Sequence, residues 1–195
     1  MKRALVIYES MYGNTEQIAR AIGEGLADRM QVEVVEVGVA PTTLAADVGL
    51  LVVGGPTHAF SMSRPGTRES AAKETESPLV SSGIGVREWL EGLEPPAESP
   101  VAAAYDTHVD HPKLPRHVGS AAAAIAKRLE NLGIEVVAEP EHFWVTGSLG
   151  PLRHVRACVH RPRGNHGRDT KPNALRRGCV RGQQQPSLQA SPRQL

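Results

Sequence analysis

Residues 4–26 read ALVIYESMYGNTEQIARAIGEGL and combine an apolar run, a polar loop and an amphipathic segment. The run Ala4–Tyr8 is continuously apolar, which is typical of a strand buried on both faces in a parallel sheet. Apolar side chains then recur every fourth residue at Ile18, Ile22 and Leu26, which predicts a helix with one apolar stripe. A strand, a polar loop and a helix in this order indicate the first unit of an α/β fold.

The loop in this stretch, SMYGNT at residues 10–15, carries hydroxyl, amide and glycine residues where the helix begins. We expect Asn14 or Thr15 to be the N-cap residue of that helix. A helix N-terminus offers free N–H groups and the positive end of the helix dipole, so it can bind an anion without Lys or Arg. The loop therefore predicts a phosphate site, with an ordinary strand-to-helix turn as the alternative. It matches neither the P-loop nor the Gly-x-Gly-x-x-Gly sequence of dinucleotide-binding folds.

Apolar runs and segments of helical period alternate along the next 120 or so residues. We expect strands at 32–37, 49–54 and 101–105, and a fifth strand split by Pro140 into 134–137 and 142–145. We expect helices at 66–76, 85–93 and 121–132, the last with Ser120 as its N-cap residue and Gly133 at its end. This alternation predicts a doubly wound α/β fold, in which a five-stranded parallel sheet has helices on both faces.

A second unusual loop, GGPTHAFSMSRP at residues 54–65, follows the predicted strand at 49–54. In a doubly wound sheet, ligands bind beyond the carboxyl ends of the strands, where the strand order reverses. The glycines allow a close approach of the backbone to a planar ligand, and His58 and Phe60 have flat side chains. We therefore expect a second binding segment formed by Pro56, Thr57, His58, Ala59 and Phe60. The alternative is a surface turn with Phe60 packed in the core.

The loop at residues 10–15 resembles the phosphate-binding loop of the flavodoxin family, Ser/Thr-x-Ser/Thr-Gly-x-Thr. Tyr12 replaces the middle hydroxyl, as it does in many quinone-reductase-like members. The Gly-Pro-Thr sequence at 55–57 is similar to the family's loop beside the isoalloxazine ring. The resemblance covers about residues 3–152 and implies the strand order 2-1-3-4-5 and FMN as the cofactor. It implies that the second binding segment contacts the flavin and that the phosphate is held by Ser10, Met11, Tyr12, Gly13, Asn14 and Thr15.

The sequence DTHVDH at residues 106–111 is predicted to be a third loop at the same crevice. In flavodoxins the corresponding loop holds the pyrimidine edge of the flavin, so the resemblance implies that Asp106, Thr107 and His108 contact FMN. The same segment also resembles the His-x-His-x-Asp-His metal sequence of metallo-β-lactamase-type hydrolases, with Asp106 in place of the first His. Such side chains could bind an ion, but nothing else in the chain supports that fold, so we expect no metal. A solvated polar loop is the other alternative.

The charge is divided unevenly along the 195 residues. Residues 1–150 contain 12 Lys and Arg against 20 Asp and Glu, whereas residues 151–195 contain 10 against one. The last segment is rich in Arg, Pro and Gly and has no apolar period, so it cannot bury enough surface to offset its ordering entropy. We therefore divide the chain into a flavodoxin-like domain, 1–152, and a basic tail, 153–195.

The tail is interpreted either as a disordered basic arm or as the product of a shifted reading frame, and its abrupt start favours the second. In both cases the C-terminal helix of the flavodoxin fold is missing. Its loss would leave apolar sheet surface uncovered, which predicts self-association through that face. The tail's sparse arginines, with no aromatic side chains between them, do not favour nucleic-acid binding.

These features predict an FMN-binding protein that carries electrons between redox partner proteins. An FMN-dependent NAD(P)H:quinone oxidoreductase acting on small quinone-like acceptors is one alternative, and a flavodoxin-like interaction module without flavin is another. We assign no catalytic side chain. The chain shows no apolar run long enough for a membrane span and no signal-peptide pattern, so we expect a cytoplasmic protein that does not contact the membrane.

Overall fold

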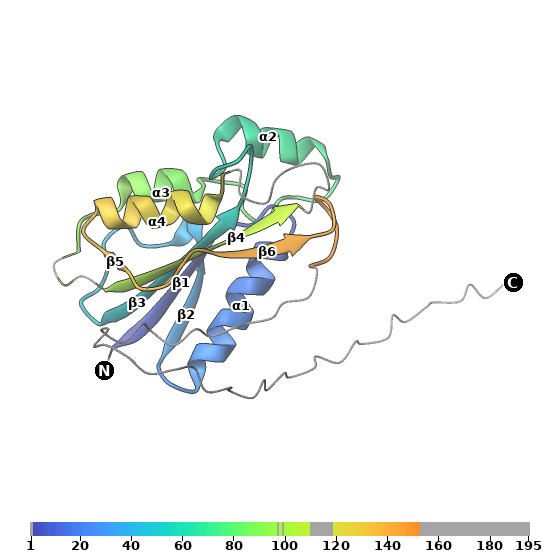
Figure 1. Ribbon diagram of the computed structural model, residues 1–195. Coiled ribbons are helices and arrows are strands. Elements are labelled where there is room, and N and C mark those ends of the chain that lie inside the picture. Colours follow the sequence, from blue (N-terminus) through green and yellow to red (C-terminus); the bar gives the residue numbers. More distant parts are fainter. Residues whose placement is uncertain (1, 97, 99, 110–118, 153–195) are drawn as a thin grey trace, which may run out of the picture. The chain divides into compact units, whose positions relative to one another are not determined.

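The computed structural model describes residues 2–96, 98, 100–109 and 119–152 (Figure 1). The predicted tail, 153–195, lies outside these residues. The strands are β1 (Arg3–Tyr8), β2 (Val32–Glu36), β3 (Val48–Pro56), β4 (Val101–Val109), β5 (Glu135–Val136) and β6 (Glu141–Val145). The helices are α1 (Asn14–Ala27), α2 (Pro65–Lys73), α3 (Val86–Gly92) and α4 (Ala121–Asn131), with a 3₁₀ turn at Val37–Val39.

The strands form one parallel sheet in the order β2-β1-β3-β4, with β5 and β6 both on the far side of β4. The short β5 pairs with the start of β4 at Val101 and Ala102, and β6 pairs with its end from Tyr105 to Val109. These two strands together occupy the fifth position of the sheet. The predicted order 2-1-3-4-5 and the split fifth strand are therefore confirmed.

The two faces of the sheet are covered by different helices (Figure 1). On one face, Ile18 and Ala19 of α1 pack with Val6, Val52 and Tyr105. The opposite face carries α3 and α4, and its buried cluster includes Leu5, Leu51, Trp89, Ile125 and Leu129. Apolar side chains thus alternate between two cores along β1 and β3, as strands buried on both faces require.

Part of the α1 face is incompletely covered in the described part of the chain. Beside α1, Leu50 is half-buried, and Val101 at the start of β4 is 36% exposed. The helix that the family resemblance would place here would follow Leu152, outside the described residues. The prediction of self-association through this face stays a prediction.

Two local expectations are wrong. The N-cap residue of α1 is Gly13, not Asn14 or Thr15, because the chain turns into the helix through a left-handed residue with φ 90°. Strand β4 continues to Val109, so Asp106 to His108 belong to the strand and not to a loop. Pairing of β4 with both β3 and β6 satisfies its backbone there, and this overrides the polar composition. The expected Ser120 N-cap of α4 is confirmed, since its hydroxyl accepts a hydrogen bond from Ala123 N at 2.8 Å.

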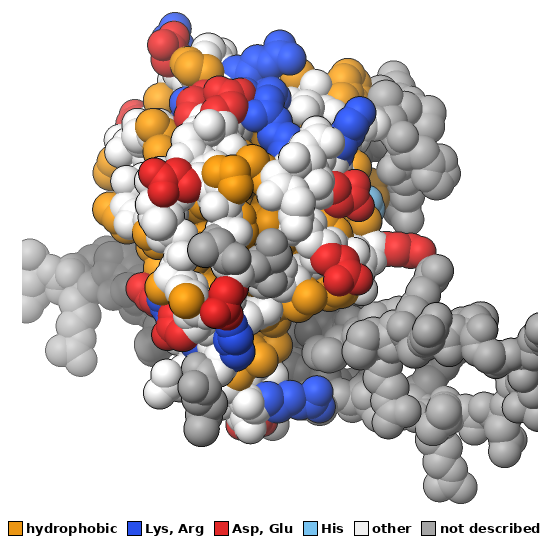
Figure 2. Space-filling view, turned by 90° about the vertical axis from the view of Figure 1, so that its left-hand side faces the viewer, with side chains coloured by type: hydrophobic (Ala, Val, Ile, Leu, Met, Phe, Trp, Pro, Cys, Tyr) orange, Lys and Arg blue, Asp and Glu red, His pale blue; other side chains and the backbone are white. Residues whose placement is uncertain are grey.

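The surface of the described residues is mixed in charge. Figure 2 shows Asp and Glu side chains spread over the face it presents, with Lys and Arg side chains mainly in its upper part. Among the residues described, we find no helix with the length and hydropathy needed to cross a bilayer.

Candidate functional site

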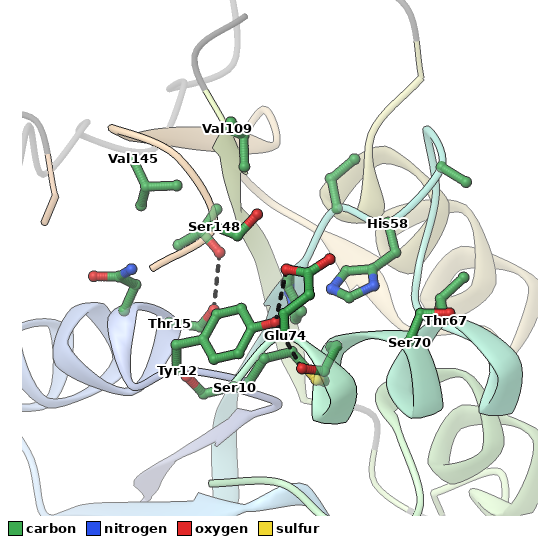
Figure 3. Close-up of a pocket in the computed structure, with 17 residues that line it drawn as sticks. Ser10, Tyr12, Thr15, His58, Thr67, Ser70, Glu74, Val109, Val145 and Ser148 are labelled. Carbon is green, nitrogen blue, oxygen red and sulfur yellow. Dashed lines mark hydrogen bonds between the residues drawn. The ribbon is translucent and has the colours of Figure 1, made fainter. Parts of the chain in front are cut away.

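A pocket of about 330 Å³ lies at the carboxyl ends of β1, β3 and β4 (Figure 3). Loops follow β1 and β3 at this edge, where the strand order reverses, so all of the lining segments converge there. Ten of the residues predicted from sequence line it: Ser10, Met11, Tyr12, Asn14, Thr15, Pro56, Thr57, His58, Ala59 and Thr107. The lining residues in the described chain include no Lys or Arg.

The loop between β1 and α1 is folded around the hydroxyl of Ser10. Gly13 N donates to Ser10 Oγ at 3.0 Å, which closes the turn before α1. Because Ser10 Oγ accepts this bond, its own hydrogen remains able to donate to another group. Gly13 has no side chain to cap the first turn of α1, and the left-handed geometry brings the loop into the helix directly.

Neighbouring segments fix this loop from two sides. Ser10 N donates to Ser81 Oγ at 3.0 Å, and Ser81 N donates to Ser10 O at 2.8 Å. The hydroxyls of Thr15 and Thr107 lie 2.9 Å apart, and Asn14 Nδ2 donates to Gly150 O at 2.9 Å. The loop is therefore held in place by contacts far apart in sequence, which is the preorganisation that a binding site requires.

A tight turn at His58–Ser61 forms a second wall. His58 N donates to Ser61 O at 2.8 Å, and Ser61 N donates back to His58 O at 3.1 Å. The central residues Ala59 and Phe60 have φ angles of 46° and 67°, both left-handed. Two positive φ values are the pattern of a type I′ turn, which is normally formed by Asn-Gly. Left-handed backbone at two residues that are not glycine stores strain, which is a feature of functional loops.

Helix α2 supplies a wall that the sequence did not predict. Thr67, Ser70 and Glu74 line the pocket. The single hydrogen of the Tyr12 hydroxyl is shared between Ala71 O at 2.9 Å and Glu74 Oε2 at 3.1 Å. Burial and the Glu74 carboxylate together raise the pKa of Tyr12 to about 12, so its hydroxyl stays a donor. Ala71, Val109, Val145 and Ser148 complete the lining. The weak amphipathic pattern of α2 gave no sequence signal for this role.

Four of the predicted residues do not line the pocket. Gly13 lies in the loop behind the lining, and Phe60 is 48% exposed at the turn. Asp106 and His108 point away, because side chains alternate along β4 and it is Thr107 and Val109 that face the pocket. We predicted that a loop at Asp106–His108 forms this wall of the pocket, but it is formed instead by alternate residues of strand β4.

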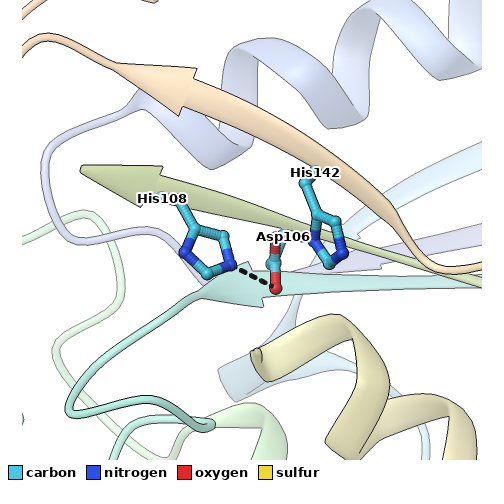
Figure 4. Close-up of side chains that lie close together, drawn as sticks. All are labelled: Asp106, His108 and His142. Carbon is cyan, nitrogen blue, oxygen red and sulfur yellow. Dashed lines mark hydrogen bonds and ion pairs between the residues drawn. The ribbon is translucent and has the colours of Figure 1, made fainter. Parts of the chain in front are cut away.

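Asp106 and His108 instead meet His142 on the other face of the sheet (Figure 4). Asp106 is fully buried, and its Oδ1 lies 2.8 Å from His142 Nδ1 while its Oδ2 lies 3.2 Å from His108 Nε2. Burial alone would raise the pKa of Asp106, but hydrogen bonds from both imidazoles and from Ala122 N hold it well below its usual value. The hydrogen bond to Asp106 raises the pKa of His142.

Two further titratable groups lie in the pocket wall and at the end of β1. His58 lines it, and burial lowers the pKa of its imidazole, which favours the neutral form. Glu9 is 1% exposed at the end of β1, where its Oε2 accepts a hydrogen bond from Val86 N at 2.8 Å. Burial raises the pKa of Glu9 in spite of this bond.

The sequence of this chain and its fold were both compared with those of known proteins. Residues 6–93 match the family model of flavodoxin. This match, over 88 of the 195 residues, supports the flavodoxin family for this part of the chain. A flavodoxin from the domain Archaea is similar in structure with a TM-score of 0.52 and 21% identity, over 73% of this chain and 82% of that one. Oxidised flavodoxin 2 from Bacillus cereus gives a TM-score of 0.50 and 20% identity, over 73% and 84%. No curated protein sequence matches the chain.

At these identities the solved flavodoxins establish the fold of this domain and no more. The family match ends at residue 93, so it covers the loop at 10–15 and the turn at 58–61 but not β4. What this domain binds has to be argued from its own pocket.

Proposed function

We propose that the flavodoxin domain binds FMN, with the phosphate at the loop of residues 10–15, and carries electrons between redox partners. The observation that carries this proposal is a pocket lined by hydroxyls and the N-terminus of α1, without Lys or Arg in its described lining. A phosphate can be bound there by N–H and O–H donors and by the positive end of the helix dipole. Ser10 is placed to donate, because its oxygen already accepts from Gly13 N.

The remaining walls suit a planar ring. The turn at His58–Ser61 and the side chains of Thr107 and Val109 enclose the pocket beyond the phosphate loop. Phe60, 48% exposed on the same turn, is an aromatic residue that directly follows the pocket-lining Ala59. Bound flavin supplies the electron chemistry, and the residues of the chain bind it, orient it and exclude water.

The charge of the domain bears on its partners. Residues 1–150 have a net charge of −8 from 12 basic and 20 acidic residues, which favours docking on basic redox partners. A two-electron quinone reductase is the second candidate, and it is favoured by one observation, the His58 imidazole in the pocket wall. Steady turnover of NADPH and a quinone by the purified protein alone would support the reductase, and no turnover supports the carrier.

The phosphate assignment can be tested with one hydroxyl deletion. Ser10→Ala removes a donor to the phosphate, and hydrogen bonds to charged groups contribute about 1.5–3 kcal/mol, so FMN affinity should fall at least about tenfold. Ser82→Ala removes an exposed hydroxyl close to the loop's anchor at Ser81 and should leave affinity unchanged. Both would be measured by quenching of FMN fluorescence. Equal affinity of the two variants would contradict the proposal, and a folded protein that leaves FMN unquenched would favour an interaction module.

A further inference from the structure

We propose that Asp106, His108 and His142 form a binding site for a divalent transition-metal ion, with Zn²⁺ as the ion that fits best. The site lies on the face of β4 and β6 opposite to the pocket lining, and it goes beyond the proposed binding of FMN. Its three possible ligand atoms all lie within 4.8 Å of one another (Figure 4).

The sheet brings these side chains together. The parallel register pairs Asp106 with His142 on the neighbouring strand, and His108 follows two residues after Asp106 on the same face of β4. Ligands on paired strands are more rigidly placed than ligands on loops. The ring of His108 packs against Trp144, with centroids 5.2 Å apart, and this contact restricts its rotation.

The separations suit a small ion after a modest adjustment. Zn–N and Zn–O bonds of about 2.0–2.2 Å in a tetrahedral site place the ligand atoms roughly 3.3–3.5 Å apart. Asp106 Oδ1 and His142 Nδ1 are now 2.8 Å apart, and Asp106 Oδ2 and His108 Nε2 are 3.2 Å apart. The three ligand atoms lie at most 4.8 Å apart, so the side chains would have to close the widest gap by up to about 1.5 Å in total. Each coordinating nitrogen would then present its lone pair, with the proton on the other nitrogen of the ring.

The surroundings supply access and support. The side chain of His142 is 36% exposed, so an ion can reach the site from solvent. The carboxylate is oriented by Ala122 N at 2.8 Å and by the hydroxyl of Thr57 at 3.0 Å, which are typical outer contacts of a metal ligand. A water molecule or the Thr57 hydroxyl, 3.2 Å from His108 Nε2, would complete four-coordination.

The ligand set selects the class of ion. Two imidazoles and one carboxylate suit Zn²⁺, Fe²⁺ and similar ions, whereas Mg²⁺ and Ca²⁺ prefer oxygen ligands only. The site also differs from the metal sequence considered at residues 106–111. Its third ligand is His142, 36 residues away, while Asp110 and His111 lie outside the described residues.

Zinc binding to the flavin-free, full-length chain tests the proposal. Isothermal titration with ZnCl₂ should show one site in the wild type. Its affinity should be lost or weakened at least about tenfold in His142→Ala and in His108→Ala, because even replacing residues outside the ligand shell lowers metal affinity about 10–100-fold. His58→Ala is the matched control and should keep the site. Five other histidines lie outside the described residues, so the difference between the variants, and not the wild-type titration alone, assigns the ion to this site.

A second measurement does not depend on the variants folding. In the wild-type protein, NMR of the imidazole nitrogens should show Zn²⁺ shifting Nδ1 of His142 and Nε2 of His108 at one equivalent. The proposal is overturned if these nitrogens do not respond, or if both substitutions bind Zn²⁺ as the wild type does.

Discussion

Replacing Gly13 with alanine isolates the conformational energy of the loop that leads into α1. Gly13 has φ 90°, and a Cβ built there would meet no atom within 4 Å. The change therefore adds no clash, and its effect on stability comes from the backbone. A left-handed residue with a Cβ costs about 1–2 kcal/mol. Alanine also restricts the unfolded chain, which stabilises the folded state by about 0.4–1 kcal/mol. We therefore expect Gly13→Ala to lower the free energy of unfolding by roughly 0.5–1 kcal/mol.

Gly25→Ala is a control with the same chemical change and the opposite expected sign. Gly25 lies inside α1, and a Cβ there also meets nothing within 4 Å. Alanine in a helix interior is more stable than glycine by about 0.5–1 kcal/mol. Gly25→Ala should therefore raise the free energy of unfolding by about the amount that Gly13→Ala lowers it.

Urea unfolding of the wild type and the two variants, followed by circular dichroism, measures both changes. The midpoints should move in opposite directions with unchanged slopes, because the surface exposed on unfolding stays the same. The expected shift in melting temperature is about 2–4 °C per kcal/mol for a chain of this size. If both variants become more stable, Gly13 is not left-handed in the protein, and the account of the loop is wrong.

Three other substitutions test the packing, the buried acid and the pocket. Gly54→Ala should lower the free energy of unfolding by about 3 kcal/mol or more, because its Cβ would lie 2.0 Å from the buried ring of Tyr105. An unchanged midpoint of thermal unfolding would show that this packing is wrong. The pKa of Glu9 is raised in the folded protein, so its protonated carboxyl stabilises the wild type fully below about pH 4, and this stabilisation is lost as the carboxyl ionises at higher pH. Glu9→Gln should therefore gain stability relative to the wild type as pH rises from about 4 to 8. Parallel curves of stability against pH would refute this. Glu74→Gln should tighten FMN binding about two- to tenfold, most at low salt, because it removes a negative charge from the pocket wall. Glu69→Gln, at an exposed position on the same helix, should leave the affinity unchanged. Equal effects of the two substitutions would count against phosphate binding near Glu74.

The architecture could be predicted because apolar runs mark buried strands directly. The runs containing Leu5 and Leu51 fix β1 and β3, and the interruption at Pro140 separates β5 from β6. The end of β4 could not be predicted from composition, since Asp106 and His108 are polar residues inside a strand. Their burial depends on partners supplied by the fold.

The candidate site shows the same division between local and tertiary information. Ser10 and Thr57 stand out because hydroxyls and glycines follow apolar strands, and strand ends meet at one edge of a parallel sheet. The role of Glu74 depends on how α2 packs over Tyr12, and His142 reaches Asp106 only through the register of β4 and β6. Neither contact leaves a pattern in the sequence.

The most direct test of the central claim is a side-by-side titration of the flavin-free protein with FMN and riboflavin, which differ by the phosphate alone. Circular dichroism would first establish that the protein is folded. If hydroxyls and backbone N–H groups at residues 10–15 bind the phosphate, FMN fluorescence should be quenched with an affinity at least about tenfold higher than that for riboflavin. Equal affinities, or FMN that keeps its free fluorescence, would contradict the account.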